Sequence, residues 1–593
     1  MKAKKIISII LVLSMVFTLV GCGESGDAAT KPNEDESTSS ELAEVQEFKY
    51  ATKSDVLSMD PAKTSSVPNW AGQALVYENL VIVKTQADNS SKVMPGMAEK
   101  WDISDDGLTY TFHLRDDAKW ADGVDVTAED FEYTWRRLYN PNSGAVYEWM
   151  VDGVIKNSAE VYVELQELLE SCKNGDEVDL DKYDKESVAI LDKLGVKALD
   201  ENTFEMKLEK PSPFFLLFVG FPPYYPVRED LIAKYGDKYG SVPEKIVGNG
   251  PFILTKWEPG ASMVYVKNDN YWNKDEVYLT KVTRQIISES NAVAQALMNN
   301  EVDSAGIDKP EWNEVIDATG IYDIQSFASP NLENFIFNCQ DDILKNKNIR
   351  LAISLAFDRE KYNNEALEGV NIPAYSMVPS CMSVGNGGKY YDMTNNECEY
   401  IKVLLEKYDP KELLLKGMEE LGLGDDPSKL EIHYMTRGTS EFSKMTAEWT
   451  QQQLHKALGI NFVIDMTEWN IMYDKIDQGE YQIAQGGWTA DYDDPSNFLD
   501  NYASDGYYGE KKLHWTGAEA DAYTDLIHKA KASSDDTERA NMYAEAEKIL
   551  LEEAAVSPQY SNKIRTLVGK YVEGYYVNPM VYQNYVGVKI MKH

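Results

Sequence analysis

The 593-residue sequence is short of positive charge. Lys and Arg number 58 against 98 Asp and Glu, which gives a formal net charge of −40. A nucleic-acid partner is therefore not expected, because binding one needs Lys and Arg to displace the counterions of the phosphates. The composition is otherwise that of a globular protein, with 43% apolar and 26% charged residues, so disorder of the whole chain is excluded.

The signatures of common enzymes and cofactor sites are also missing. The histidines form no HExxH, no GxSxG occurs, and no Gly-rich stretch has both the length and the Ser or Thr of a P-loop. Adjacent acids such as Asp493 and Asp494 are available for acid–base chemistry, but such pairs are expected by chance among 98 acids. The residues thus indicate neither an enzyme nor a cofactor.

Cysteine is scarce, at five residues, and no CxxC motif occurs. Neither a redox motif nor a Cys-type zinc site is indicated, and no other metal site is evident. Cys381 and Cys398 are the nearest pair in the sequence, but pairing cannot be read from spacing alone.

Long apolar runs are limited to one, near the N-terminus. Three lysines precede an uncharged run from Ile6 to Val20, which is too short for a membrane span of about 20 residues and typical of a secretory signal. The run ends in Leu19-Val20-Gly21-Cys22, which resembles the lipobox of bacterial lipoproteins, in which the Cys thiol is diacylated and the chain is cut before it. We expect residues 1–21 to be a signal peptide and Cys22 a lipid anchor on the outer side of the cell membrane, because two acyl chains anchor a protein stably.

Residues 22–47 are rich in Gly, Ser, Thr, Asp and Glu and contain few large apolar residues. Such a segment cannot bury a core, so the sequence predicts a flexible acidic tether between the lipid and the folded part.

Several elements can be predicted from local patterns. Leu108 to Leu114 alternates apolar and polar residues after Asp106-Gly107, which predicts a hairpin. Thr127 and Asp130 resemble a capping box that opens a helix over 131–138. Apolar spacing predicts four more helices, and the acidic stretch 174–184 is expected to be a loop. The four helices are expected over 158–172, 349–362, 441–458 and 535–553.

Five blocks, in a characteristic order, carry a resemblance that covers residues 48–593. They are Ser58-Met59-Asp60-Pro61; Pro95 to Trp101 continuing through Lys119-Trp120-Ala121-Asp122-Gly123 to Phe131; Gly248 to Phe252 with Asn270-Tyr271-Trp272; Ile349 to Glu360; and Gly487 to Tyr492. Together they resemble the signatures of the extracellular solute-binding proteins that serve peptide and nickel ABC importers, and most of all the oligopeptide-binding branch.

The resemblance implies an α/β fold with mixed sheets: a two-lobed, three-domain clamp of the periplasmic-binding-protein type, with a hinge between the lobes. One lobe would combine three segments, and an accessory domain would carry a helical, acidic surface insertion near 158–186. The expected segments are 48–77, 227–330 and 563–593 for lobe I, 78–226 for the accessory domain, and 331–562 for lobe II.

The function implied is that of a monomeric, lipid-anchored receptor that captures oligopeptides and delivers them to an ABC permease with its ATPase subunits. A dipeptide, a nickel chelate, a sugar or a signalling peptide is an alternative ligand. A surface peptidase, an adhesin or a chaperone is an alternative of another class.

The resemblance also assigns ligand contacts. Asp491 aligns with the carboxylate that holds the α-ammonium group of a peptide, although a solvated loop acid or a helix N-cap is the alternative. Two segments, Ser65-Ser66-Val67 and Gly487-Trp488-Thr489, would pair with the backbone of an extended peptide. Gly487 would permit a close backbone approach, or belong to an ordinary turn before a strand. The rings of Trp488 and Tyr147 would line the cleft, or else belong to the core.

The sequence departs from the family at the other end of the ligand. Enteric oligopeptide binders place basic side chains or a His where peptide carboxylates fall, and those positions align with Gln485, Ile476, Glu365 and Ser443. None of the four is cationic. We therefore expect longer or C-terminally protruding peptides, with basic side chains facing Glu365.

Overall fold

The computed structural model describes residues 41–593, except 87–89, 175–176, 308, 387 and 581–583. The expected signal peptide, Cys22 and most of the tether lie outside the described residues. Within the described part of the chain, no helix is both long and apolar enough to cross a membrane.

A seven-stranded sheet gathers strands from three distant stretches of the chain. β1 lies parallel between β12 and β13, and β21 returns from near the C-terminus to pair with β13 and β14. Helix α7 (Ser290–Met298) packs Val293 and Leu297 into a buried cluster with Leu567 of β21. The spatial order is β10 (Phe252–Glu258), β11 (Ser262–Lys267), β12 (Lys281–Ile286), β1 (Glu47–Thr52), β13 (Ser304–Gly306), β21 (Lys563–Gly569) and β14 (Tyr322–Ala328).

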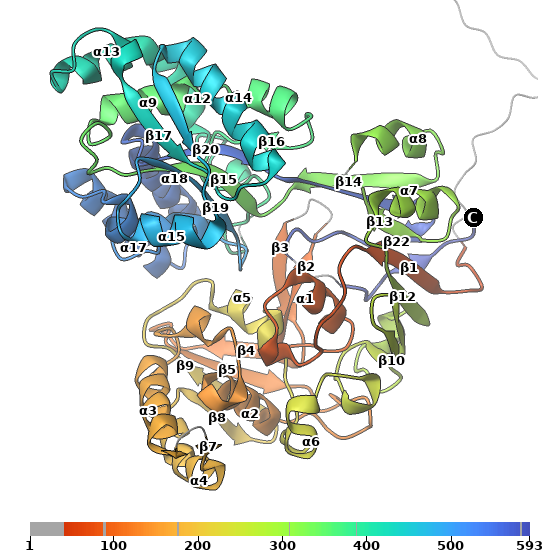
Figure 1. Ribbon diagram of the computed structural model, residues 1–593. Helices are drawn as coiled ribbons and strands as arrows, with labels where there is room; N and C mark the ends of the chain where they lie inside the picture. Colours follow the sequence, from red (N-terminus) through yellow and green to blue (C-terminus); the bar gives the residue numbers. More distant parts are fainter. Residues whose placement is uncertain (1–40, 87–89, 175–176, 308, 387, 581–583) are drawn as a thin grey trace, which may run out of the picture.

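A six-stranded mixed sheet forms the centre of the second lobe. Its central strands β15 and β19 pair antiparallel from Asn331 opposite Thr489 to Phe337 opposite Ile483. The spatial order is β16 (Ile372–Pro373), β20 (Val556–Ser561), β15 (Asn331–Phe337), β19 (Ile483–Thr489), β17 (Glu431–Met435) and β18 (Asn461–Asp465). The longer helices of this lobe, seen on both sides of the sheet in Figure 1, are α9 (Lys347–Ala356), α12 (Tyr400–Lys407), α13 (Pro410–Glu420), α14 (Glu441–Leu458), α15 (Trp469–Asp477), α17 (Ala518–Ala532) and α18 (Asp536–Glu552).

A four-stranded antiparallel sheet lies below the other two in Figure 1. It contains the predicted hairpin, and Gly107 in its turn has the positive φ of 69° that the motif needs. The predicted capping box is confirmed, since the Thr127 amide donates to the Asp130 carboxylate (3.0 Å) at the start of α2 (Ala128–Tyr139). The spatial order is β4 (Ala98–Ile103), β5 (Thr109–Leu114), β9 (Thr203–Lys207) and β8 (Val196–Asp200).

The segment predicted as a surface insertion forms a packed helical hairpin. Helix α3 (Ser158–Ser171) matches the prediction, but the loop expected over 174–184 is wrong because α4 (Leu180–Leu191) begins inside it. Asp179 caps α4 by accepting from the Lys182 amide (3.1 Å). Val161 and Leu165 of α3 and Tyr183 of α4 are fully buried, so this segment shares the core of its domain.

Two further expectations need correction. The helix expected over 349–362 ends at Ala356, because Asp358 accepts from the Lys361 amide (3.1 Å) and so caps a new short helix, α10 (Arg359–Lys361). The tether does not extend to residue 47. Residues 41–43 are bound to the C-terminal segment, where the Ala43 amide donates to the Ile590 carbonyl (2.9 Å).

The chain crosses between the six-stranded and seven-stranded sheets twice, side by side. One crossing joins β14 to β15 through Ser329 and Pro330, and the other joins β20 to β21 through Asn562. The Ser329 amide donates to the Asn562 carbonyl (2.7 Å), and the Asn562 amide donates to the Asn331 side chain (3.0 Å). The arrangement seen in Figure 1 confirms the predicted two-lobed α/β clamp.

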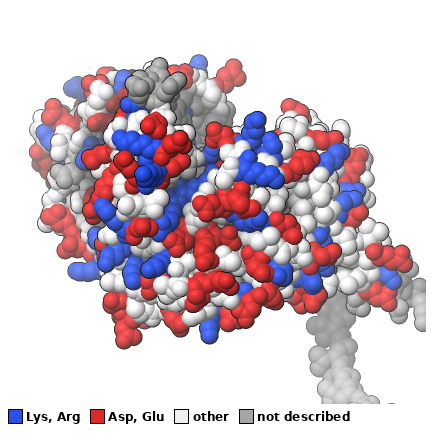
Figure 2. Space-filling model, turned by 90° about the horizontal axis from the view of Figure 1, so that it is seen from below, with Lys and Arg blue, Asp and Glu red and all other residues white. Residues whose placement is uncertain are grey.

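Acidic and basic side chains are mixed on the face that Figure 2 shows, and the described cysteines form no disulfide. On the face shown in Figure 2, acidic and basic side chains are interspersed over the surface. The four described cysteines are free thiols, and Cys381 and Cys398 are buried without forming a disulfide.

Candidate functional site

Asp491 lies where the two halves of the molecule meet. It lies two residues after β19, and its Oδ1 accepts a hydrogen bond from the hydroxyl of Tyr147 (3.1 Å), which lies between α2 and α3. The backbone amide of Asp491 donates to the Asn497 side chain (3.2 Å), which also accepts from the indole of Trp488 (2.8 Å). Asn497 therefore sets the positions of both predicted ligand contacts.

Burial makes the Asp491 carboxylate unusual. It raises the pKa of Asp491 to about 6, and the hydrogen bond from Tyr147 only partly offsets this effect. Within the described part of the chain, no Lys or Arg forms an ion pair with Asp491. A half-buried carboxylate with a hydroxyl as its one side-chain partner is suited to receive a cation from outside the protein.

Aromatic side chains hold this region together. Tyr147 is 7% exposed and its ring packs against Trp70 and Phe221, each at 5.5 Å between centroids. Tyr492, next to Asp491, stacks on Phe214 at 5.3 Å. Tyr147 is thus both a core residue and a site residue, since its ring is packed and its hydroxyl reaches Asp491.

One edge of β19 is open beyond residue 484. Pairing between β17 and β19 involves only Ile483 and Ala484, whereas β15 pairs along the whole of β19. The amide of Asn338 donates to the carbonyl of Gln482, and that of Ala490 donates to Pro330, so the even-numbered residues of β19 bond to β15. The backbone groups of residues 487 and 489 therefore point to the open edge, where an extended peptide can add as a strand. The Gly487 carbonyl already accepts a hydrogen bond from the Tyr508 hydroxyl there (3.3 Å).

The two glycines of β19 serve side-chain packing. They lie within the strand, so the alternative of a turn before a strand is wrong. A Cβ on Gly486 would lie 2.8 Å from Ile336, and one on Gly487 would lie 2.7 Å from a guanidinium nitrogen of Arg437. Gly487 thus makes room for the Arg437 side chain, and the close approach of a peptide backbone at Gly487 stays a prediction.

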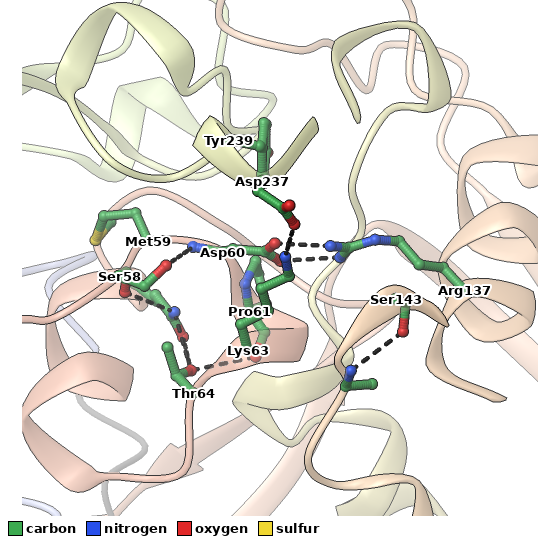
Figure 3. Close-up of polar contacts among 12 residues, drawn as sticks. Ser58, Met59, Asp60, Pro61, Lys63, Thr64, Arg137, Ser143, Asp237 and Tyr239 are labelled. Carbon is green, nitrogen blue, oxygen red and sulfur yellow. Dashed lines mark hydrogen bonds and ion pairs between the residues drawn. The ribbon is translucent and has the colours of Figure 1, made fainter. Parts of the chain in front are cut away.

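The second predicted segment, Ser65-Ser66-Val67, lies at the start of α1 (Val67–Gln73), whose Trp70 packs against Tyr147, and its pairing with a peptide stays a prediction. Ser66 is the N-cap residue and its hydroxyl accepts from the Asn69 side chain (2.8 Å), while Ser65 and Val67 are exposed. Just upstream, the buried Asp60 accepts two hydrogen bonds from Arg137 of α2 (2.9 and 2.7 Å), as Figure 3 shows. This bidentate pair fixes the loop that leads to Ser65 against α2.

Gln485 belongs to a polar network centred on Glu333, which lies on the neighbouring strand β15 opposite Gly487. Its side-chain amide donates to Glu333 (3.0 Å), and its carbonyl oxygen accepts from the hydroxyl of Tyr434 (2.6 Å). The Nη2 atom of Arg437 lies 2.6 Å from both carboxylate oxygens of Glu333. Arg437 was missed in the sequence because it lies outside the four positions aligned with carboxylate-binding residues.

The other three aligned positions, Ile476, Ser443 and Glu365, are buried or hydrogen-bonded to other side chains. Ile476 is buried inside α15, and Ser443 hydrogen-bonds to Ser440 in the first turn of α14. Glu365 accepts from the indole of Trp449 (3.0 Å), nearly two turns further along α14. A contact between Glu365 and a ligand remains a prediction.

Comparison with known proteins settles the family. The model of bacterial extracellular solute-binding proteins, family 5, matches residues 92–510. This chain belongs to that family. It is 30% identical over 540 residues to the periplasmic oligopeptide-binding protein OppA of Salmonella typhimurium, with 90% of each chain covered, and 28% identical over 559 residues to the oligopeptide-binding protein OppA of Bacillus subtilis, with 93% of each covered.

Solved structures of family members match in fold over nearly the whole chain. The unliganded open form of the murein tripeptide-binding protein MppA is 25% identical, with a TM-score of 0.75 over 94% of this chain and 99% of its own. Another structure of MppA, from Escherichia coli, gives 0.66 at 25% identity, over 93% of this chain and 100% of its own.

The acids that follow Asp491 have structural partners in this family member. Asp494 forms a buried ion pair with Arg539, and Asp493 accepts from the Ser383 amide (2.7 Å). Both carboxylates are fully buried. They hold the segment after the site in place, and their geometry gives no support to the acid–base chemistry considered from sequence.

Proposed function

We propose that this solute-binding protein is a monomeric, lipid-anchored receptor that captures oligopeptides by their α-ammonium group and delivers them to an ABC permease with its ATPase subunits. The observation that carries the proposal is the Asp491 carboxylate, which is half buried, lacks a cationic partner among the described residues, and lies at one end of the open edge of β19.

Three features support the proposal. The open edge offers backbone groups to a peptide, and Ser65-Ser66-Val67 lies at the start of α1, whose Trp70 packs on the Tyr147 that contacts Asp491. Relatives across the whole chain are named as oligopeptide-binding or dipeptide-binding proteins, and a Listeria monocytogenes OppA, 26% identical with a TM-score of 0.63, is described as bound to peptide. The names of these relatives describe binding, which favours a receptor over an enzyme.

The test is isothermal calorimetry with short peptides and their N-acetylated forms. We expect Asp491→Asn to weaken binding of free peptides at least tenfold, because the ion pair with the ammonium group is lost. Asp323→Asn, a change of an exposed acid on β14, is the matched control and should bind as the unmodified protein does. Equal affinity of the unmodified protein for acetylated and free peptides would overturn the assignment of Asp491.

The lipid anchor can be tested separately. Cys22→Ser should release the protein from cells into the medium and abolish incorporation of labelled palmitate. Retention of the Cys22→Ser protein on the membrane would contradict the proposed lipid anchor. It would not count against the proposal that the protein binds peptides.

A further inference from the structure

Arg437 lies across the open edge of β19. It comes from the loop that leaves β17 on one side of β19, yet its guanidinium contacts Glu333 of β15 on the other side. The side chain must therefore pass over β19, and it does so at Gly487, where a Cβ would lie 2.7 Å from Nη1. The strand has a glycine at the point where the guanidinium rests on it.

The contacts of Arg437 leave part of the guanidinium for a ligand. Both carboxylate oxygens of Glu333 bind the same nitrogen, Nη2, so Nη1 and Nε take no part in that ion pair. The guanidinium also lies 5.0 Å from the ring of Trp469, which limits its movement. Nη1, which makes neither hydrogen bond to Glu333, keeps N–H groups that can donate to a carboxylate.

The distance along the strand sets the length of ligand that fits. Asp491 and Gly487 are four residues apart, which corresponds to about 13 Å along a β-strand. A peptide that starts at Asp491 and runs antiparallel to β19 reaches Arg437 with its third or fourth residue.

We infer that Arg437 binds the terminal carboxylate of a tri- or tetrapeptide whose ammonium group is bound by Asp491. Glu333 and Gln485 act as positioning residues, since the first holds the guanidinium and the second holds Glu333. The inference rests on the proposed function and adds ligand length and the need for a free C-terminus. It replaces the expectation that no cation is available for short peptides.

The test uses trialanine and tetraalanine as free acids and as C-terminal amides, with calorimetry as the measurement. We expect the unmodified protein to bind each acid at least tenfold tighter than its amide. Arg437→Gln should bind the acid and the amide equally, at about the affinity the unmodified protein has for the amide. Hexaalanine should show no such difference in either protein, because its carboxylate lies beyond Arg437.

Two controls separate a direct contact from a structural effect. Arg437→Gln leaves Glu333 without its partner, so the double variant Arg437→Gln/Glu333→Gln restores the charge balance and should give the same result. Lys444→Gln, on the exposed face of α14, should keep the preference for acids.

Two results would overturn the inference. In the first, Arg437→Gln and the double variant keep the preference for acids, which places the carboxylate elsewhere while the proposed function stands. In the second, the unmodified protein binds acids and amides equally, so no residue selects the carboxylate. Failure of the unmodified protein to bind any of the six peptides would instead reject the proposed function, and the inference with it.

Discussion

At the scale of single residues, the protonation of Asp491 links the empty protein to its ligand. Burial disfavours the charged carboxylate and raises its pKa from the usual 3.8 to about 6. An ammonium group placed beside it favours the charged form instead, so binding releases a proton wherever the empty site is protonated.

This coupling predicts a bell-shaped dependence of peptide affinity on pH. Affinity should rise with pH up to about 6 as Asp491 ionises, and fall above about 8 as the α-amine of the peptide loses its proton. Calorimetry between pH 4.5 and 9 measures both limbs. Asp491→Asn should remove the acid limb, and an unchanged acid limb in that variant would assign the titration to another group.

The same shift determines how Asp491 affects stability. Between pH 3.8 and about 6 the folded protein keeps a proton that the unfolded chain has lost, so this carboxyl lowers the free energy of unfolding as pH rises through that window. Above about pH 6 the buried carboxylate is charged, and the full cost of burying that charge lowers the free energy of unfolding. Asp491→Asn removes it, and the empty variant should therefore not melt below the unmodified protein at pH 7.5 in a thermal scan.

At the scale of elements, the helical hairpin of α3 and α4 is a structural part of its domain. Leu165 is fully buried, whereas Val163 on the same helix is 55% exposed. Leu165→Ala should lower the free energy of unfolding by about 2–5 kcal/mol, because it leaves a cavity. Val163→Ala is the matched control, with an expected effect within about 0.5 kcal/mol in urea unfolding.

Peptide affinity decides whether the hairpin also contributes to the site. The two variants should bind peptides as the unmodified protein does, since neither residue is a hydrogen-bond partner of Asp491. A loss of affinity in folded Leu165→Ala would show that the hairpin affects the site.

Helices α14 and α4 show which helices local sequence patterns can predict. Helix α14 could be predicted to the residue, because Ser440 caps its start and Gly459 ends it with a φ of 80°. Helix α4 could have been found from Leu180, Tyr183 and Leu191, whose spacing places them on one helix face, but the surrounding acids favoured a loop.

The ligand site was only partly predictable for a physical reason. Asp491 and Trp488 are close in sequence and within a matching block, so the resemblance identified them. Arg437 reaches Gly487 from another strand, and only the sheet order β15-β19-β17 brings the two together. Alignment of single positions does not reveal a contact that depends on which strands are neighbours.

At the scale of the whole molecule, ligand binding should change the angle between the lobes. Among the described residues, the segment 331–561 that contains the six-stranded sheet joins the rest of the chain at two crossings, Ser329-Pro330 and Asn562, which lie side by side. Two adjacent links of this kind permit rotation about one axis, as in other hinged clamps. A peptide that touches both halves favours the closed arrangement because it binds that state more tightly.

Small-angle scattering measures this change directly. Saturating peptide should reduce the radius of gyration of the unmodified protein, whereas Asp491→Asn at the same peptide concentration should keep the value of the empty protein. Tyr147→Phe removes the hydrogen bond between the halves in the empty protein, so its empty form should be at least as extended as the unmodified one and still become compact with peptide. If the unmodified protein binds peptide with no change in its radius of gyration, the site is already formed in the open arrangement, and closure is not what holds the ligand.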